Sequence, residues 1–119
     1  MAGAPTEFKG AVATGIKHML YAVYCLDNEN TEALRDQHRT KHREYLDQWK
    51  DNLFFSGPLL DDVDENIQLG SLFIMKVKDR AEAESYIYNE VFYKAGVFSK
   101  VTIVRMRKGR YNPALAADL

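Results

Sequence analysis

The spacing of apolar residues along this chain predicts strands and helices in alternation. Continuous apolar runs indicate strands over residues 18–26, 53–56, 69–77 and 98–106. Apolar residues at helical spacing follow the turn-forming residues 27–31 and predict a first helix that ends near Asp51. The stretch Asp79-Arg80-Ala81-Glu82 is typical of a helix cap, so a second helix is expected to begin at Arg80 and to run through Ile87.

Glycine, proline and acidic residues mark the expected ends of these elements. Gly57-Pro58 is expected to stop the second strand at Ser56, because proline cannot donate a hydrogen bond to a central ladder. Residues 61–66 are mostly acidic and indicate a solvated loop. Residues 91–96 are expected to form a short turn that closes at a glycine.

The order β-α-β-β-α-β predicts an α+β fold in which two helices cover one face of a four-stranded antiparallel sheet. The first and third strands are apolar at consecutive positions, so both of their faces are expected to be buried. An uncovered sheet face would be a large apolar patch, which soluble monomers rarely tolerate. We therefore expect a homodimer that packs sheet against sheet.

Length and composition indicate one domain. Residues 1–17 show no periodicity and are expected to form an arm, residues 18–108 the domain, and residues 109–119 a tail. The net charge is -1, with no long block of either sign, which argues against a nucleic-acid partner. The chain also lacks an apolar run long enough for a membrane span and the ordered regions of a secretory signal. The single cysteine, Cys25, lies in an apolar strand as a buried free thiol, which favours a cytoplasmic location.

His42 is the leading candidate for a catalytic residue. The apolar stripe of the first expected helix consists of Leu34, His38, His42, Tyr45, Leu46 and Trp49. A polar ring on such a stripe faces the core or a pocket, where it must find a partner. The alternative is a structural histidine bonded to a backbone carbonyl. His38 and His42 are an i, i+4 pair, but a metal needs a third ligand and no H-E-x-x-H arrangement follows, so no metal is expected.

Aromatic side chains are candidates for the wall of a small-molecule pocket. We name Tyr21, Phe55 and Phe92 as candidate substrate contacts, although aromatic residues of strands and helices more often belong to the core. Ser56 is a candidate hydrogen-bond partner for a substrate, and its alternative role is to stabilise a turn. The sequence has no phosphate-binding glycine loop, nucleophile elbow or CxxC pair, so no cofactor is expected.

Three short motifs occur in order: Arg39-Thr40-Lys41-His42 with Tyr45-Leu46, then Ser56-Gly57-Pro58-Leu59, then Phe92-Tyr93-Lys94-Ala95-Gly96-Val97-Phe98. Together they resemble the YciI-like (YCII-related) proteins, small members of the dimeric α/β-barrel superfamily. The similarity covers roughly residues 18–108. It implies a ferredoxin-like fold, a dimer, and a pocket in which a histidine and an acidic residue act together.

The resemblance places the histidine of the family's R-x-x-H pattern on His42 and the acidic residue on Glu90. That acidic residue is usually an aspartate followed by proline, whereas here glutamate is followed by Val91. Glutamate has a longer side chain than aspartate, and a turn without proline is less restricted. Both differences change the distance and orientation between the acid and the histidine, and acid-base partners must lie within hydrogen-bond reach. The alternative for Glu90 is an exposed carboxylate in a turn.

The expected function is that of a small cofactor-independent enzyme. His42 would move a proton on a small cyclic or aromatic-derived substrate while Glu90 orients the imidazole, which suits isomerase or lyase chemistry. Two alternatives remain open: a non-enzymatic module that binds a small molecule, and a cofactor-free oxygenase of the same superfamily.

Overall fold

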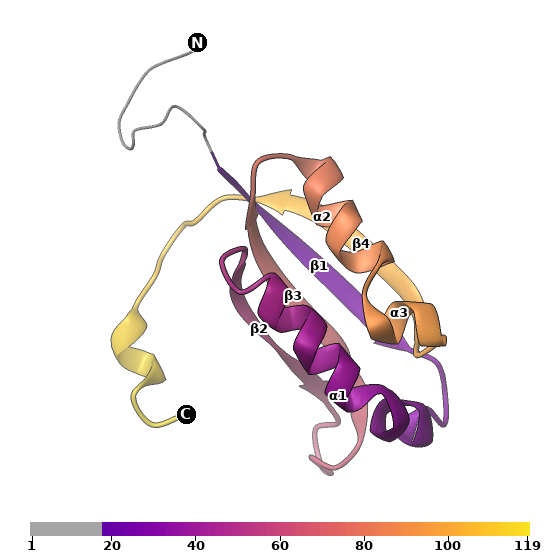
Figure 1. Ribbon diagram of the computed structural model, residues 1–119. Coiled ribbons are helices and arrows are strands. Elements are labelled where there is room, and N and C mark those ends of the chain that lie inside the picture. Colours follow the sequence, from indigo (N-terminus) through magenta and orange to yellow (C-terminus); the bar gives the residue numbers. More distant parts are fainter. Residues whose placement is uncertain (1–17) are drawn as a thin grey trace.

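The computed structural model describes residues 18–119, and the arm expected for residues 1–17 lies outside the described residues. Its elements are β1 (Met19–Asp27), α1 (Glu32–Gln48), β2 (Leu53–Leu60), β3 (Gln68–Val77), α2 (Arg80–Tyr88), α3 (Val91–Ala95), β4 (Phe98–Met106) and a 3-10 turn, η1 (Pro113–Ala116). The strands form one sheet, and α1, α2 and α3 lie side by side over one of its faces (Figure 1).

The sheet has four strands in the order β2-β3-β1-β4, and every neighbouring pair is antiparallel. In β1, Val23 lies opposite Phe73 of β3 on one side and Ile103 of β4 on the other. The central strands are β1 and β3. Helix α1 connects β1 to the edge strand β2, a hairpin connects β2 to β3, and α2 with α3 connects β3 to the other edge strand, β4. This confirms the predicted α+β, ferredoxin-like βαββαβ fold.

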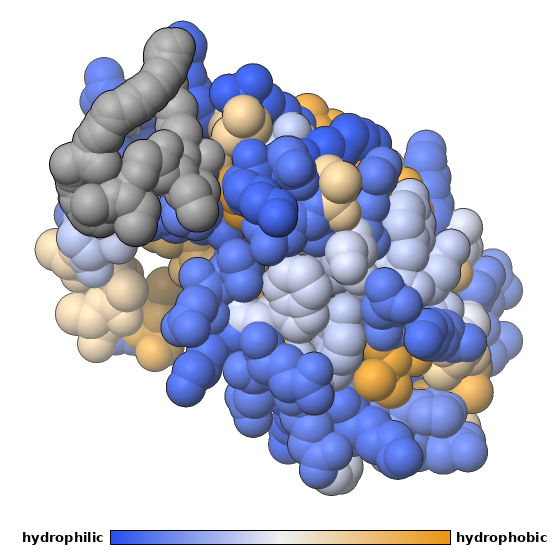
Figure 2. Space-filling model, turned by 45° about the horizontal axis from the view of Figure 1, so that its top comes forward, coloured by the Kyte–Doolittle hydropathy of each residue, from blue (hydrophilic) through white to orange (hydrophobic). Residues whose placement is uncertain are grey.

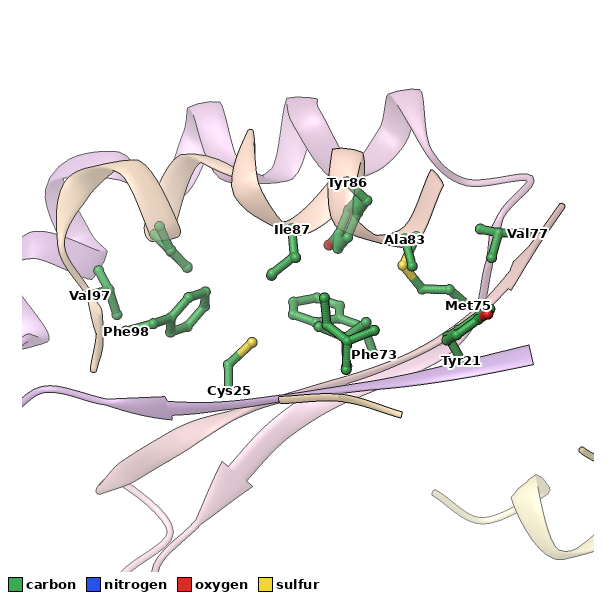
Figure 3. Packing of buried hydrophobic residues seen from close by; sticks show 13 residues of the cluster. Tyr21, Cys25, Phe73, Met75, Val77, Ala83, Tyr86, Ile87, Val97 and Phe98 are labelled. Atoms are coloured by element: carbon green, nitrogen blue, oxygen red, sulfur yellow. The ribbon is translucent and has the colours of Figure 1, made fainter. Parts of the chain in front are cut away.

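Burial alternates along β1. Tyr21, Val23 and Cys25 are buried beneath the helices, whereas Ala22 and Tyr24 face the opposite side and are partly exposed. Within one chain the expectation that this strand is buried on both faces is therefore wrong, because the helices cover only one face. The core fills the space between sheet and helices, where side chains of α2 point toward the strands (Figure 3).

Cys25 is a free thiol with no exposed surface. Its side chain points from β1 into the core (Figure 3). Burial raises the pKa of the thiol to about 12, and the negative charges of Glu90 and Asp27 add to the effect. The buried free thiol expected from the sequence is confirmed, and at neutral pH it behaves as a small apolar group.

Strand β2 is longer than the sequence predicts. It continues through Gly57 and Pro58 to Leu60, so the expected stop at Ser56 is wrong. Among the described strands, β2 lies at the edge of the sheet and pairs with β3 alone. An edge strand tolerates the missing N–H of Pro58, which a central strand would not.

Helix α1 ends at Gln48, with Trp49 as its C-cap, slightly before the expected end near Asp51. The cap predicted for the second helix is confirmed, because the side chain of Asp79 accepts a hydrogen bond from the Glu82 amide at 2.9 Å and α2 begins at Arg80.

Residues 91–95 form the short helix α3 instead of the expected turn. Gly96 closes this helix with a positive φ of 87°, a backbone conformation that favours glycine. The second helical crossover is thus divided into α2 and α3, and the break between them places Glu90 at the N-cap of α3.

The two sides of the molecule differ in character. The helical side seen in Figure 2 is largely hydrophilic. The opposite face of the sheet includes Tyr24, Phe55 and Val104, which are 44%, 62% and 54% exposed. No helix within residues 18–119 is long and apolar enough to cross a membrane. The C-terminal segment leaves the sheet, and the ring of Tyr111 packs against Phe54 with 5.8 Å between centroids.

Candidate active site

His42 and Glu90 are in direct contact. Nδ1 of His42, on α1, lies 2.6 Å from Oε2 of Glu90, in the break between α2 and α3. The side chain of His42 is 16% exposed and that of Glu90 is fully buried. An ionised carboxylate only accepts hydrogen bonds, so opposite such a group Nδ1 is the donor of this contact. The other ring nitrogen, Nε2, is then the atom left for a ligand.

The backbone of α3 holds the Glu90 carboxylate. Oε2 also accepts a hydrogen bond from the amide of Phe92 at 3.0 Å, the N-cap interaction of this helix. Oε1 is buried and makes no hydrogen bond within residues 18–119. The negative charge of Glu90 also raises the pKa of the buried Tyr86 phenol, after the larger effect of burial itself. The carboxylate is thus fixed by a single oxygen in an apolar surrounding.

The imidazole is held by an aromatic ring as well as by the carboxylate. The rings of His42 and Phe92 are stacked, with 3.9 Å between centroids and 11° between planes. Tyr45, three residues after His42 on α1, donates a hydrogen bond of 2.8 Å to the backbone oxygen of Tyr86 on α2. This bond ties α1 to the neighbouring helix and so supports the distance between the histidine and the acid.

His42 opens onto a pocket of about 350 Å³ between α1 and the strands β2 and β3. The pocket is lined by Arg35, Arg39, His42, Arg43, Leu46, Ser56, Gly57, Pro58, Gln68, Ser71, Phe73 and Phe92. A larger hollow of about 620 Å³ borders it and shares Arg35, Arg39 and Gln68, but it does not include the histidine. The smaller pocket is therefore the candidate active site, since a general base must reach its substrate.

Of the residues predicted from the sequence, the structure brings His42, Glu90, Phe92 and Ser56 to this pocket or its wall. Tyr21 lies in the core and Phe55 on the opposite face of the sheet, and neither lines the pocket. Phe55 is excluded because side chains alternate along β2, which turns Ser56 toward the helices and Phe55 away from them, whereas Tyr21 of β1 is buried in the core.

His38 does not line the pocket either. Within residues 18–119 no group of three or more His, Cys, Asp or Glu side chains is placed to hold a metal ion.

Arg35 is a site residue that the sequence analysis missed. It is the one buried residue of α1, 6% exposed, and its guanidinium donates to both carboxylate oxygens of Asp27 at 3.1 and 2.9 Å. Its carbon Cζ also lies 4.8 Å from the centroid of the Phe92 ring. The signal in the sequence is the spacing of Arg35, Arg39 and Arg43, four residues apart on one side of the helix.

A solved structure shows the same fold. A 5-chloro-2-hydroxyhydroquinone dehydrochlorinase (TftG) from Burkholderia phenoliruptrix AC1100, in complex with 2,5-dihydroxybenzoquinone, matches with a TM-score of 0.70 and 29% identity, over 76% of this chain and 96% of that chain. PA3566 from Pseudomonas aeruginosa matches at a TM-score of 0.47 and 13% identity, over 80% of this chain and 98% of that chain. A search of curated proteins finds no significant match.

The family relationship rests on most of the chain. The model of the YCII-related domain matches residues 19–107, from the first residue of β1 to just beyond the end of β4. The resemblance drawn from the three short motifs is thereby confirmed. This chain belongs to the YCII-related domain family.

Proposed function

We propose that this protein is a small enzyme in which His42 moves a proton on a small ring-shaped substrate, with isomerase or lyase chemistry. The contact of 2.6 Å between His42 Nδ1 and Glu90 Oε2, at the wall of the pocket, carries the proposal. A histidine whose second nitrogen faces a ligand site is a suitable general base near neutral pH. The chemistry needs no cofactor, because a single base can move a proton or drive an elimination.

In this mechanism Nε2 of His42 removes a proton from the substrate. In the lyase form the electron pair of the broken bond to hydrogen forms a new double bond, the bond to the leaving group breaks, and that group departs with its electron pair; the imidazolium then gives its proton to the leaving group or to solvent. In the isomerase form the electron pair shifts within the substrate, and the imidazolium returns the proton to another atom of the substrate. Glu90 keeps the hydrogen on Nδ1 and stabilises the positive ring, since its carboxylate is buried beside it.

The similarity to the Burkholderia dehydrochlorinase supports the lyase form of this proposal. That protein is 29% identical and nearly its whole length is matched. Removal of hydrogen chloride is an elimination of the kind that a general base can drive. We therefore propose hydroxylated six-membered rings as the first substrates to test.

The test compares two histidines of the same helix. The purified protein is incubated with 5-chloro-2-hydroxyhydroquinone and with a panel of related hydroxylated rings, and product formation is followed by absorbance and chloride release. His42→Ala should lower kcat by about 10²–10⁴-fold, the usual contribution of a general acid or base. His38→Ala, one turn away and outside the pocket, should leave kcat within about twofold because it is not in reach of the ligand.

Three results would overturn the proposal. Full turnover by His42→Ala would remove the histidine from the mechanism. Saturable binding without product across the panel would favour a binding module. Oxygen consumption that matches substrate loss would favour an oxygenase.

We also propose that the protein forms a homodimer through the face of the sheet that the helices leave uncovered. Tyr24, Phe55 and Val104 share this face and are each more than 40% exposed in the single chain. Burial of such apolar area releases about 25 cal/mol per Å². This proposed packing leaves the His42 pocket, on the helical side of the sheet, accessible.

A further inference from the structure

The pocket beside His42 has an unusual balance of charge. Three arginines line it (Arg35, Arg39 and Arg43), and the residues that line it within the described part of the chain include no aspartate or glutamate. Glu90 lies behind the imidazole and is fully buried. The neighbouring larger hollow differs, because four carboxylates line it: Asp27, Glu29, Glu32 and Asp36. Positive charge is therefore concentrated at the pocket that contains the histidine.

The three arginines differ in how far they are already neutralised. Arg35 is fixed by Asp27 through Nε and Nη2, while its third nitrogen, Nη1, makes no hydrogen bond within residues 18–119. Arg39 pairs with Asp36, but both side chains are well exposed, at 42% and 70%. Such surface pairs contribute little and exchange readily.

Arg43 completes the set. It forms no ion pair with any residue in the 18–119 range. Arg39 and Arg43 therefore offer guanidinium groups that a ligand can engage at little cost.

We propose that this pocket selects planar ring compounds that carry an anionic oxygen, and that Arg39 and Arg43 bind this oxygen while the ring lies near His42. The inference rests on the proposed function, since it names the substrate class of the same pocket. Guanidinium groups bind oxyanions through two parallel N–H donors, and these charge-assisted hydrogen bonds are roughly twice as strong as neutral ones. Ser56 and Gln68 add uncharged polar groups to the same wall.

An anionic substrate also suits the proposed chemistry. Removal of a proton increases the negative charge on the substrate ring, and fixed positive groups stabilise that charge as it develops. Arg39 lies three residues before His42 on α1, so both side chains come from neighbouring positions of one helix face. The arginines would thus act on binding and on the reaction from the same rigid element.

The experiment measures binding, not turnover. Two matched pairs of probes are titrated into the protein by calorimetry: benzoate against benzamide, and 4-nitrophenolate against 4-nitroanisole above the pKa of the phenol. Nuclear magnetic resonance of the His42 ring locates each probe in the pocket. The charged member of at least one pair should bind about tenfold more tightly or better, the effect of one charge-assisted contact. Selectivity in the first pair alone identifies a carboxylate as the preferred anion, and in the second pair alone a phenolate.

Single substitutions on α1 assign this selectivity. Arg39→Gln and Arg43→Gln should each remove most of the preference for the charged probe. Lys41→Gln removes one positive charge from the same helix but outside the pocket lining, so it should change the preference by less than about twofold. Asp36→Asn should strengthen anion binding by about two- to fivefold, because it releases Arg39 from its competing partner.

The inference is overturned if neither charged probe is preferred, if neither pair binds at the His42 ring, or if Lys41→Gln matches the arginine variants. These outcomes are separate from those of the proposed function. Anion binding that depends on Arg39, without any turnover, would leave this inference standing and remove the enzyme. Turnover of neutral rings that depends on His42 would support the enzyme and overturn the inference that the pocket selects anions.

Discussion

The imidazole of His42 lies parallel to the ring of Phe92, with 3.9 Å between their centroids. The backbone amide of the same Phe92 donates to Oε2 of Glu90, the oxygen that contacts His42. One residue of α3 therefore supports both members of the proposed pair, the histidine through its side chain and the acid through its main chain. This arrangement separates two effects that substitutions can test.

Replacement of the Phe92 side chain should loosen the orientation of the His42 ring and leave the contact between His42 and Glu90 in place. Phe92→Leu keeps an apolar group and the backbone amide but loses the stacked ring. The imidazole then samples more orientations, and we expect kcat to fall about tenfold while KM changes less, since orientation contributes steeply to rate. The variant should lose less unfolding free energy than the roughly 3–5 kcal/mol of a Phe→Ala change. Steady-state kinetics and urea unfolding measure both; an unchanged kcat would contradict the positioning role.

A shorter carboxylate at position 90 should still cap α3, but it should not reach His42. Glu90→Asp retains a good N-cap for α3, yet it lacks one methylene and should lose the contact of 2.6 Å. We expect a fall in kcat of about 10²-fold, typical of a misplaced acid-base group, with a loss of about 1–3 kcal/mol of unfolding free energy, because the buried carboxylate loses one hydrogen-bond partner. Glu90→Ala, which loses cap and contact together, is the comparison. Equal kcat for wild type and Glu90→Asp would show that the contact is dispensable.

Cys25 should make the fold less stable at alkaline pH. Its pKa is raised from 9.0 to about 12 by burial, so above pH 9 the unfolded chain releases a proton that the folded chain retains. The contribution of the protonated thiol to the unfolding free energy is therefore fully present below pH 9. It is lost as the pH rises toward 12, at up to about 1.4 kcal/mol per pH unit. Cys25→Ala should show a shallower decline in unfolding free energy over this range. Identical slopes for the two proteins would contradict the expectation.

The Asp27–Arg35 pair should be costly to break from one side. Both side chains are more than nine-tenths buried, and removal of one leaves the other charge without a partner. Arg35→Met and Asp27→Leu should each cost about 3–5 kcal/mol of unfolding free energy. The double variant should cost less than the sum of the two, because it leaves no unpaired charge. Denaturant unfolding of the four proteins gives this coupling energy, and additive losses would speak against it.

A charge on the uncovered sheet face should weaken the proposed dimer. Val104→Asp places a carboxylate among the exposed apolar residues of that face. Val63→Asp makes the same change in a loop where the side chain is 95% exposed. Light scattering coupled to size-exclusion chromatography should report a monomer for the first variant and a dimer for the second. A wild-type protein of monomer mass would remove the dimer from the proposal.

Local patterns were enough to predict the main elements, because each depends on neighbouring residues. The helix-cap pattern of Asp79 to Glu82 predicted the start of α2 at Arg80, and the order of strands and helices predicted the βαββαβ fold. The end of β2 could not be found in this way, since the tolerance for Pro58 depends on its place at the edge of the sheet.

The candidate site was only partly visible in the sequence. His42 stands out as a polar residue on an apolar stripe, whereas Glu90 was found through the family resemblance, because the contact joins residues 48 positions apart. Arg35 was missed because arginines are usually solvated, and its burial depends on Asp27 at the end of another element. The structure places the two members of the pair in contact, and their catalytic roles stay predictions.

The break between α2 and α3 has a thermodynamic consequence. The oxygen of Glu90 that caps α3 is the same oxygen that contacts His42. If α3 opens, even briefly, the cap and the partner of the imidazole are lost together, because local unfolding of a short helix releases its N-cap. The stability of five helical residues, Val91–Ala95, therefore sets the fraction of molecules in which the histidine is correctly held.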